Sequence, residues 1–456
     1  PKSTPFVLKG SSSNPNGAAL SYCWEQNDTA TTSFGANSIA FPTKKDGPLF
    51  RSFPPTNSPN RFMPELAKVV SNSLNSQWES VADIARTMYF TLTVRDNGGI
   101  GLAQADTDAM IVTVDATKGP FEITSQNTSN LSWKPLSLET INWAVNSTDQ
   151  LPGSANVNIK LSIDGGLTFP IFLKTNTPND GSERIFVPNG ILGKNCRILI
   201  EPTNNIFFAI NKEPFAIGYT IESSCATYAF ETPIVIPESA SYTAKTITVP
   251  TTSGAVSDVN VDLSFTHQYL SDVQIELVNP QGKKVKLFEN GCSDTNGSLV
   301  LKYDDLGGTI ICGKQTVQTV APFEPLYQFN EWNPSGTWTL RVRDAIAGDT
   351  GIINSATISI CTKSFTPMAL SPIDLTKVMV YPNPNQGDFV VLFSSQFNSG
   401  ITIIIHDLLG KKIYEKGFPS ASLFNEAIHL ESVQAGMYLL TVIDGSTTTY
   451  KKIIIN

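Results

Sequence analysis

The chain has 456 residues, with 32 Lys and Arg against 40 Asp and Glu, so its formal net charge is −8. This length accommodates about three or four domains. The acidic balance argues against a nucleic-acid-binding surface, which needs clustered basic residues. No apolar run approaches the roughly 18 residues that a membrane-spanning helix requires. Charged residues make up only 16% of the chain, below the usual quarter, and polar uncharged residues replace them, as is common in extracellular β proteins.

Strand patterns dominate the chain. Short runs rich in β-branched and aromatic residues alternate with clusters of Gly, Pro, Asn and Asp, which is typical of strands joined by turns. The run Met63–Leu74 is the one segment with a helix-like pattern. We therefore predict an all-β protein of tandem β-sandwiches. The expected domains are 1–117, 118–221, 222–363 and 377–456, with a linker over 364–376.

The first expected domain, 1–117, is predicted to be an Ig-like sandwich with a core built around Trp24. Its stretch 27–79 is long and poor in strands, and insertions of that size lie on the surface and are often functional or mobile. Asp96, Asp106 and Asp108 offer clustered carboxylates that suit calcium. The sequence Asp96-Asn-Gly-Gly is more simply explained as the turn of a hairpin.

The second expected domain, 118–221, is predicted to be an Ig-like or fibronectin-like sandwich. The segment 162–169 (Ser-Ile-Asp-Gly-Gly-Leu-Thr-Phe) resembles the Asp-box turn of sugar-handling propellers, but a propeller would need repeated copies. We interpret it as a hairpin in which Asp164 caps its own turn.

Several stretches of the first 220 residues resemble the region that follows the catalytic domain in secreted bacterial metalloproteases of the reprolysin-like zincin type. That resemblance implies an accessory role beside a protease. The stretches that carry it are Pro1-Lys-Ser-Thr-Pro-Phe6, Leu20-Ser-Tyr-Cys-Trp-Glu-Gln26, Thr91-Leu-Thr-Val-Arg-Asp-Asn97, Leu161-Ser-Ile-Asp-Gly-Gly-Leu-Thr-Phe-Pro170 and Asn205-Ile-Phe-Phe208.

The third expected domain resembles the P domain of subtilisin-like proprotein convertases. The resemblance implies a jelly-roll sandwich that supports a protease and is not itself catalytic. It rests on the stretches 259–272, 273–282, 303–305, 336–344 and 348–351. Aspartates recur at strand ends and turns of these stretches, and calcium prefers several oxygen ligands. We therefore expect a calcium site built from Asp272, Asp305, Asp344 and Asp349, with turn capping as the alternative.

Six cysteines suit an oxidising compartment. We predict that Cys292 pairs with Cys312, which closes a loop worth about 3 kcal/mol in the chain-entropy model. We also predict that Cys225 pairs with Cys361 and joins the first and last strands of the third domain. Cys23 and Cys196 lie in different expected domains and stay unassigned.

The C-terminal stretch, 377–456, reads as a small Ig-like sandwich in which Gly410 supplies a hairpin turn. It resembles the type A C-terminal sorting domain of cargo proteins of the bacterial type IX secretion system. The residues that carry this resemblance are Tyr381, Pro382, Asn383, Pro384 and Gly387, then Gly436 and Tyr438, then Lys451 and Lys452 with the apolar ending that follows them.

This resemblance implies export through the periplasm and outer membrane to the cell surface or medium. The expected partners are an outer-membrane shuttle, the translocon and a sortase that cuts within 364–376. Because 450–456 reads as a strand without blunting residues, we expect its free edge to offer unpaired backbone groups to the shuttle.

No catalytic motif is visible. A zincin needs His-Glu-x-x-His, whereas this chain has three histidines, His267, His406 and His429, far apart and none followed by Glu. We interpret His267 as a structural residue of the third domain. We expect a catalytic domain, with any zinc, to precede Pro1. The main hypothesis is the accessory and export half of a secreted zinc metalloprotease. The alternatives are a surface adhesin or binding protein, of the kind used in gliding motility, and a structural stalk.

Overall fold

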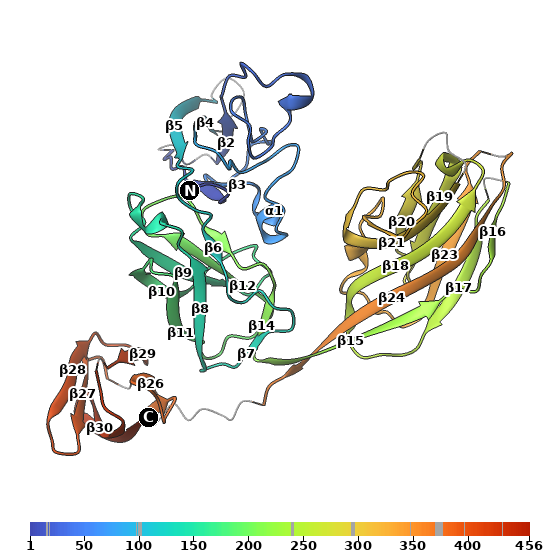
Figure 1. Ribbon diagram of the computed structural model, residues 1–456. Helices are drawn as coiled ribbons and strands as arrows, with labels where there is room; N and C mark the ends of the chain where they lie inside the picture. The colour runs from blue at the N-terminus through green and yellow to red at the C-terminus, as the bar shows by residue number, and fades with distance from the viewer. Residues whose placement is uncertain are drawn as a thin grey trace. The chain divides into compact units, whose positions relative to one another are not determined.

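The computed structural model describes residues 1–14, 17, 19–96, 98, 103–238, 241–292, 297–346, 348–369, 377–395, 397–430 and 432–456. The described chain consists almost entirely of strands arranged as tandem β-sandwiches (Figure 1), which confirms the predicted fold class. It divides into two compact units, one formed by Pro1–Tyr219 with Pro367–Asn456 and one formed by Thr220–Thr366. Each unit is described by itself below.

The first part of unit 1 contains a sheet of order β2-β4-β5 and a separate pair β1-β3. Trp24 is buried, as predicted, with 6% of its surface exposed. The short helix expected after Met63 is present as α1. The elements are β1 (Phe6–Leu8), β2 (Leu20–Gln26), η1 (Gly35–Ser38), β3 (Arg61–Met63), α1 (Leu66–Val70), β4 (Arg86–Asp96) and β5 (Ala105–Val114).

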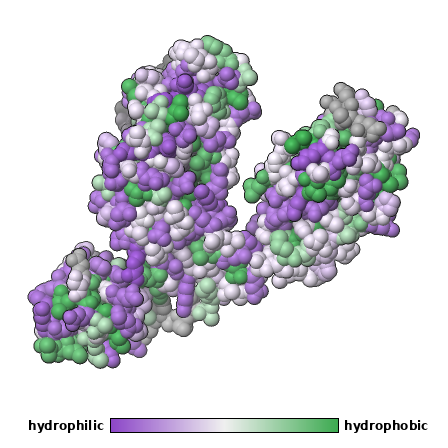
Figure 2. Space-filling model, viewed as in Figure 1, coloured by the Kyte–Doolittle hydropathy of each residue, from purple (hydrophilic) through white to green (hydrophobic). Residues whose placement is uncertain are grey.

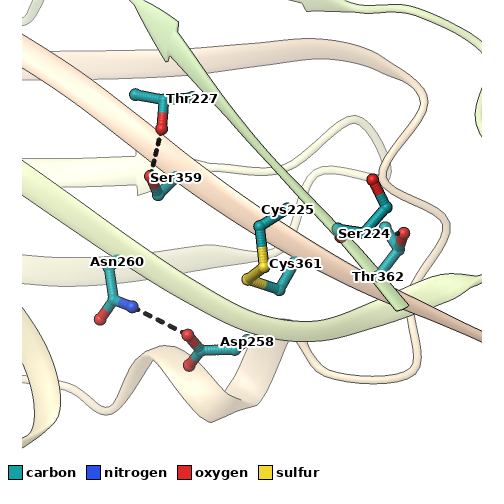
Figure 3. The surroundings of a disulfide bond; sticks show 8 residues. All are labelled: Ser224, Cys225, Thr227, Asp258, Asn260, Ser359, Cys361 and Thr362. Atoms are coloured by element: carbon teal, nitrogen blue, oxygen red, sulfur yellow. Dashed lines mark hydrogen bonds between the residues drawn. A yellow bond between two sulfur atoms is a disulfide. The ribbon is translucent and has the colours of Figure 1, made fainter.

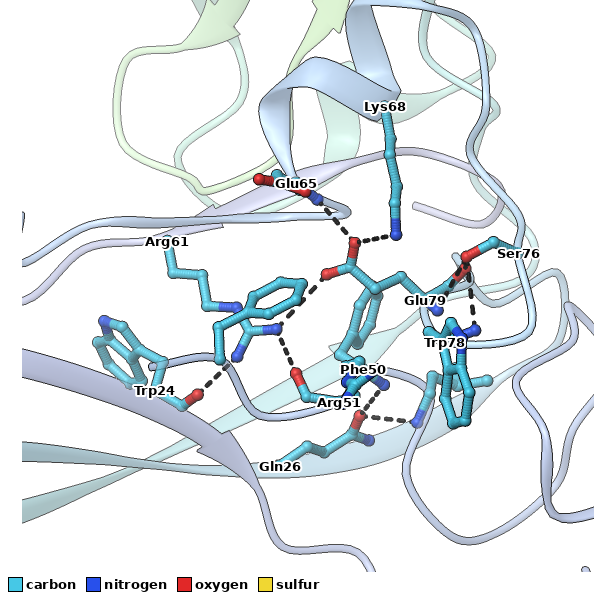
Figure 4. Close-up of polar contacts among 12 residues, drawn as sticks. Trp24, Gln26, Phe50, Arg51, Arg61, Glu65, Lys68, Ser76, Trp78 and Glu79 are labelled. Atoms are coloured by element: carbon cyan, nitrogen blue, oxygen red, sulfur yellow. Dashed lines mark hydrogen bonds and ion pairs between the residues drawn. The ribbon is translucent and has the colours of Figure 1, made fainter. Parts of the chain in front are cut away.

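The long insertion between β2 and β4 is held by one buried carboxylate, that of Glu79 (Figure 4). Its side chain is fully buried and lies 3.0 Å from Lys68 Nζ and 3.4 Å from Arg61 Nη2. It also accepts the backbone N–H of Glu65 at 3.1 Å. Burial lowers the pKa of the Arg61 guanidinium, and the charge of Glu79 opposes that effect. The insertion is therefore anchored by a charge network that joins β3, α1 and the segment before β4.

We predict that Glu79→Gln destabilises the protein by about 2–4 kcal/mol, because two partly buried cations lose their counter-charge. Chemical denaturation of the full chain measures this. The matched control is Glu122→Gln, whose exposed ion pair with Lys212 should contribute less than about 1 kcal/mol. Equal effects of the two substitutions would show that the Glu79 network does not anchor the insertion.

The second part of unit 1 consists of two facing sheets, of order β10-β9-β12-β14-β7 and β11-β8-β6, with β13 paired to β12. The elements are β6 (Glu122–Ile123), β7 (Ser132–Trp133), β8 (Leu138–Ala144), η2 (Thr148–Gln150), β9 (Asn156–Ser162), β10 (Ile171–Pro178), β11 (Ser182–Phe186), β12 (Gly193–Pro202), β13 (Ala209–Ile210) and β14 (Phe215–Ile217).

The turn after β9 is organised by Asp164, as the sequence predicts. Its carboxylate accepts the backbone N–H groups of Leu167 and Thr168 at 3.1 and 3.0 Å and the hydroxyls of Thr168 and Ser162 at 2.6 Å each. Partial burial works to raise its pKa, but the hydrogen bonds from Ser162 and Thr168 prevail and lower the pKa of Asp164 to about 2. The residue is thus a structural cap of its own turn.

Because the pKa of Asp164 falls from 3.8 to about 2 on folding, its ionised form stabilises the native state above pH 3.8, and this contribution disappears as the pH falls through the folded pKa. We predict that Asp164→Ala lowers the melting temperature at pH 7 and that the difference shrinks between about pH 4 and pH 2. The control Asp180→Ala removes one long hydrogen bond to Ser182. A pH-independent effect of Asp164→Ala would contradict the assignment.

The two parts of this region share a continuous core, although the sequence suggests separate sandwiches. Phe207 stacks edge-on against Phe121, and Phe208 stacks edge-on against Phe62 of β3. The backbone N–H of Phe208 donates to the carbonyl of Pro5, and that of Val7 donates to Ile206. Residues 1–219 therefore pack as one body, because the Phe62–Phe208 ring contact and these backbone hydrogen bonds bridge its two halves.

Unit 2 is a two-layer sandwich. One sheet has the order β15-β24-β18-β21-β22, with β16 paired to β24, and the other has the order β17-β23-β19-β20. Trp338, Leu340 and Val342 alternate into the core. The elements are β15 (Tyr219–Ala229), β16 (Ile234–Ile236), β17 (Thr243–Val249), β18 (Ala255–His267), η3 (Leu270–Asp272), β19 (Val273–Val278), β20 (Lys284–Glu289), β21 (Gly297–Gly308), β22 (Gln318–Val320), η4 (Leu326–Phe329), β23 (Gly336–Asp344) and β24 (Gly351–Pro367).

Both predicted disulfides form in unit 2. Cys225–Cys361 joins the neighbouring strands β15 and β24 (Figure 3). Cys292–Cys312 closes a loop with a sequence separation of 20 residues. Cys23 and Cys196 are free and buried, and burial raises the pKa of the Cys196 thiol to about 12. A thiol that is buried and protonated in this way is chemically inert.

The C-terminal part of unit 1 is a separate small sandwich with its own core. Its sheets have the orders β25-β26-β29 and β28-β27-β30-β31. Gly410 supplies the predicted turn between β27 and β28 with a φ of +82°. The elements are β25 (Met379–Tyr381), β26 (Asp388–Ser394), β27 (Ile401–Asp407), β28 (Lys412–Phe418), β29 (Leu423–His429), β30 (Gly436–Asp444) and β31 (Thr447–Ile455).

Candidate functional site

Three sequence segments that are far apart in the chain meet along strand β31. On one side β31 pairs with β30, so that Gly436 faces Ile455 and Tyr438 faces Ile453. The side chain of Tyr438 is 9% exposed, belongs to the core and donates its hydroxyl to the Gln434 carbonyl at 2.8 Å. The Gly436–Tyr438 segment thus lies directly beside the last residues of the chain.

On its other side β31 is covered by the segment that follows β25. The Asn383 side-chain amide donates to the Lys452 carbonyl and accepts the Ile454 N–H, both at 2.8 Å. The Asn385 backbone accepts the Asn456 N–H at 2.7 Å and donates to the Ile454 carbonyl at 2.9 Å. These contacts occupy backbone groups that an added strand would use.

The expectation that the end of β31 offers a free edge is therefore wrong for residues 452–456. The physical reason lies in the Pro-Asn pattern. Pro382 and Pro384 have no N–H and cannot form a strand ladder. The Asn383 amide carries both a donor and an acceptor, so it replaces one peptide group of the missing partner strand.

The turn at residues 385–387, which follows this segment, requires the residues that it has. Asn385 is 5% exposed and its side-chain oxygen accepts the Gly387 N–H at 2.8 Å. Gly387 has a φ of +99°, and a Cβ at this position would lie 3.0 Å from the Leu430 carbonyl oxygen. Its own carbonyl accepts the Leu430 N–H at 2.9 Å. Glycine is needed here for both conformation and space.

The two lysines of the ending point to opposite faces of β31, as adjacent strand residues do. Lys452 is exposed on the face away from the core, whereas Lys451 is partly buried on the side of Ile453. The structure thus brings Asn383, Gly436 and Tyr438 together beside β31, whereas Tyr381 pairs with Val390 of β26. Asn385 is not among the residues singled out from the sequence, and its burial follows from pairing that the sequence does not display.

Three of the four aspartates proposed as calcium ligands have separate local partners, and Asp344 Oδ1 accepts the Ile346 N–H at 2.9 Å. Asp305 accepts the N–H groups of Leu326 and Tyr327, each at 2.7 Å, and so caps η4. Asp272 accepts the hydroxyl of Ser271 at 3.0 Å. Within the described residues, no three His, Cys, Asp or Glu side chains form a group that could hold a metal ion. The convergence of these four carboxylates is thus not seen, and calcium binding stays a prediction. Asp349 is half-buried.

His267 is buried beside Asp344, and both side chains are fully inaccessible. Its Nδ1 accepts the Tyr269 N–H at 3.1 Å. Its Nε2 lies 3.7 Å from Asp344 Oδ2, beyond hydrogen-bonding distance, and both of these atoms lack a hydrogen-bond partner. The histidine is therefore a buried structural residue whose polar contacts are only half satisfied.

Comparison with protein families assigns two parts of the chain. Residues 379–456 match the model of the secretion system C-terminal sorting domain. This stretch contains the whole arrangement around β31. Residues 379–456 are a type IX secretion sorting domain. Residues 256–360 match the proprotein convertase P-domain and lie within unit 2. The sorting domain implies export to the cell surface or secretion and interaction with the type IX machinery.

The chain also shows similarity to known proteins. It is 26% identical over 138 residues to a transglutaminase-activating metalloprotease of Streptomyces mobaraensis, a match that covers 30% of this chain and 15% of the length of that relative. Among solved structures, the Aeromonas sobria serine protease in complex with its chaperone aligns at 19% identity over 32% of this chain and 27% of that chain, with a TM-score of 0.23. The human desmocollin-1 ectodomain aligns at 10% identity over 100% and 76%, with a TM-score of 0.15.

The described helices include none that is long and apolar enough to cross a membrane. The expected linker 364–376 begins within β24, which extends to Pro367, and its residues 370–376 lie outside those that the structure describes.

We predict that Asn383→Ala accelerates amide hydrogen exchange at Ile454 and costs about 1–2 kcal/mol, because two backbone groups of β31 lose their partner. Exchange measured by mass spectrometry on C-terminal peptides tests this. Asn398→Ala, in an exposed turn, is the matched control. Unchanged amide exchange at the end of β31 in Asn383→Ala would show that the Asn383 side chain does not hold the strand.

Proposed function

We propose that this chain is the non-catalytic accessory and export part of a secreted zinc metalloprotease. The observation that supports this most directly is the similarity to a metalloprotease of Streptomyces mobaraensis, found in a chain that also carries a P domain and a sorting domain. The match spans only 15% of that relative. Proteolytic activity of this protein is therefore part of the proposal and does not follow from the match.

In this proposal the tandem sandwiches support the protease outside the cell. The continuous core of residues 1–219 gives a rigid spacer, and the disulfides of unit 2 suit an oxidising compartment. In this proposal zinc would be held by a separate catalytic part of the secreted protein.

The sorting domain would be captured by an outer-membrane shuttle and passed through the translocon. The shuttle would contact the end of β31, which is held by the 383–385 segment on one edge and by the 436–438 segment on the other. A sortase would then cut within 364–376 and release or anchor the rest of the protein.

The test is to isolate the exported protein with an antibody raised against residues 1–219 and to measure its zinc content and its hydrolysis of peptide bonds. We predict one zinc ion for each polypeptide and proteolysis that a chelator abolishes and zinc restores. A mock isolation from cells that lack the gene is the control. An exported protein without zinc or proteolysis, but with binding to glycans or cell surfaces, would favour the adhesin alternative and contradict the proposal.

A further inference from the structure

The sorting domain carries an apolar patch on the outer face of the sheet β28-β27-β30-β31. We define the patch by Leu408, Leu409, Met437, Leu439 and Tyr450, whose exposed fractions are 71%, 95%, 40%, 41% and 63%. Scattered exposed apolar residues are normal, but a contiguous group marks a binding surface. Figure 2 shows hydrophobic residues at the surface of this domain among hydrophilic ones.

The patch is contiguous because of the strand register. Leu439 lies between His406 on β27 and Lys452 on β31. Met437 pairs with Ile454, and Thr441 pairs with Tyr450. The residues that alternate with these, such as Ile405 and Leu440, point into the core. One side of this sheet is therefore buried, and the other exposes its own apolar residues.

The two leucines of the β27–β28 turn are held in place. Asp407 Oδ1 accepts the N–H groups of Leu409 and Lys411, both at 2.9 Å, and the Gly410 N–H donates to the Asp407 carbonyl at 3.1 Å. Only Asp407 and Gly410 are needed to form this turn. Its geometry does not require apolar side chains at 408 and 409, which the turn keeps in solvent. The backbone that carries these side chains is thus already ordered before binding, which lowers the entropy cost of binding.

The turn lies at the same end of the sheet as the sorting segments, because Asp407 pairs with Tyr438 and Tyr438 pairs with Ile453. Basic side chains border the patch. Lys411 and Lys452 are exposed, and Lys412 forms an ion pair with Glu415. An occupant must therefore match apolar side chains at the centre and positive charge at the border.

We propose that this patch is the docking surface for a protein of the export machinery, one that presents an apolar surface bordered by carboxylates. The proposal rests on the proposed export function and names the surface that performs it. A protein suits the patch better than a lipid surface, because Thr441 and Lys452 lie between its apolar residues on a flat sheet, and such a mixture of apolar and polar groups is typical of a protein interface. Recognition then uses the folded sheet and not only the last residues.

The experiment uses the full protein in cells that carry the type IX system. Leu408→Ser with Leu409→Ser, and separately Leu439→Ser, should lower the exported fraction by about tenfold, as expected for central interface residues. Lys452→Glu should also lower it, through repulsion by the partner's carboxylates. The control Leu306→Ser removes an equally exposed leucine, 96% accessible, from unit 2 and should leave export unchanged.

Two further arms separate the explanations. Melting temperatures of the purified variants should match the parent, because the replaced leucines lie outside the core, so a loss of export cannot be assigned to unfolding. Deletion of 379–456 must abolish export. If the deleted protein is exported normally, the export function itself is wrong. If deletion abolishes export but the leucine variants are exported normally, only the docking surface is wrong. Loss of binding to phosphatidylglycerol vesicles with normal export would indicate a lipid surface and overturn the protein partner.

Discussion

The sorting domain depends on the hydrogen bonds that fix its last strand. A chain terminus normally frays, and an edge strand leaves backbone groups unpaired. Here Asn383 and Asn385 form hydrogen bonds with one edge of β31 over residues 452–456. Strand β30 pairs with the other edge. The end of the chain is therefore an internal part of a small sandwich. Its exposed face can be presented in one conformation, which recognition by a partner requires.

The same constraint changes how the export signal is understood. A free terminal strand would be recognised by added backbone pairing, which carries little information about side chains. A covered strand offers side chains instead, from Lys452 on the outer face and from the apolar residues beside it. The residues that hold the strand and the residues that face a partner are then different groups, and substitutions can separate them.

The rest of the chain supplies stiffness by other means. Residues 1–219 share their core clusters, and the ring of Phe208 contacts that of Phe62 across the two halves. Glu79 anchors a long insertion through buried charge. Unit 2 combines a large core with two disulfides. These devices suit a protein that works outside the cell, where thiols are oxidised and no cellular factor refolds it.

Local patterns in the sequence were sufficient for features that local chemistry determines. The turns at Asp164 and Gly410 and the helix α1 follow from short-range rules. Features that depend on pairing between distant segments were not visible. The pairing role of Asn383 was not visible, because its partner Ile454 lies at a sequence separation of 71. The aspartates of unit 2 suggested one ion site, yet strand geometry gives Asp305 and Asp272 separate partners.

The fixed end of β31 is tested most directly by removing it. A protein that ends at Lys451 loses Lys452 and the three isoleucines that complete the strand, together with every contact that Asn383 and Asn385 make to it. Its export should be measured against the intact protein, with the disulfides of unit 2 mapped as a check on folding. The account predicts that the truncated protein stays inside the cell with both disulfides formed. Normal surface levels of the truncated protein would contradict it.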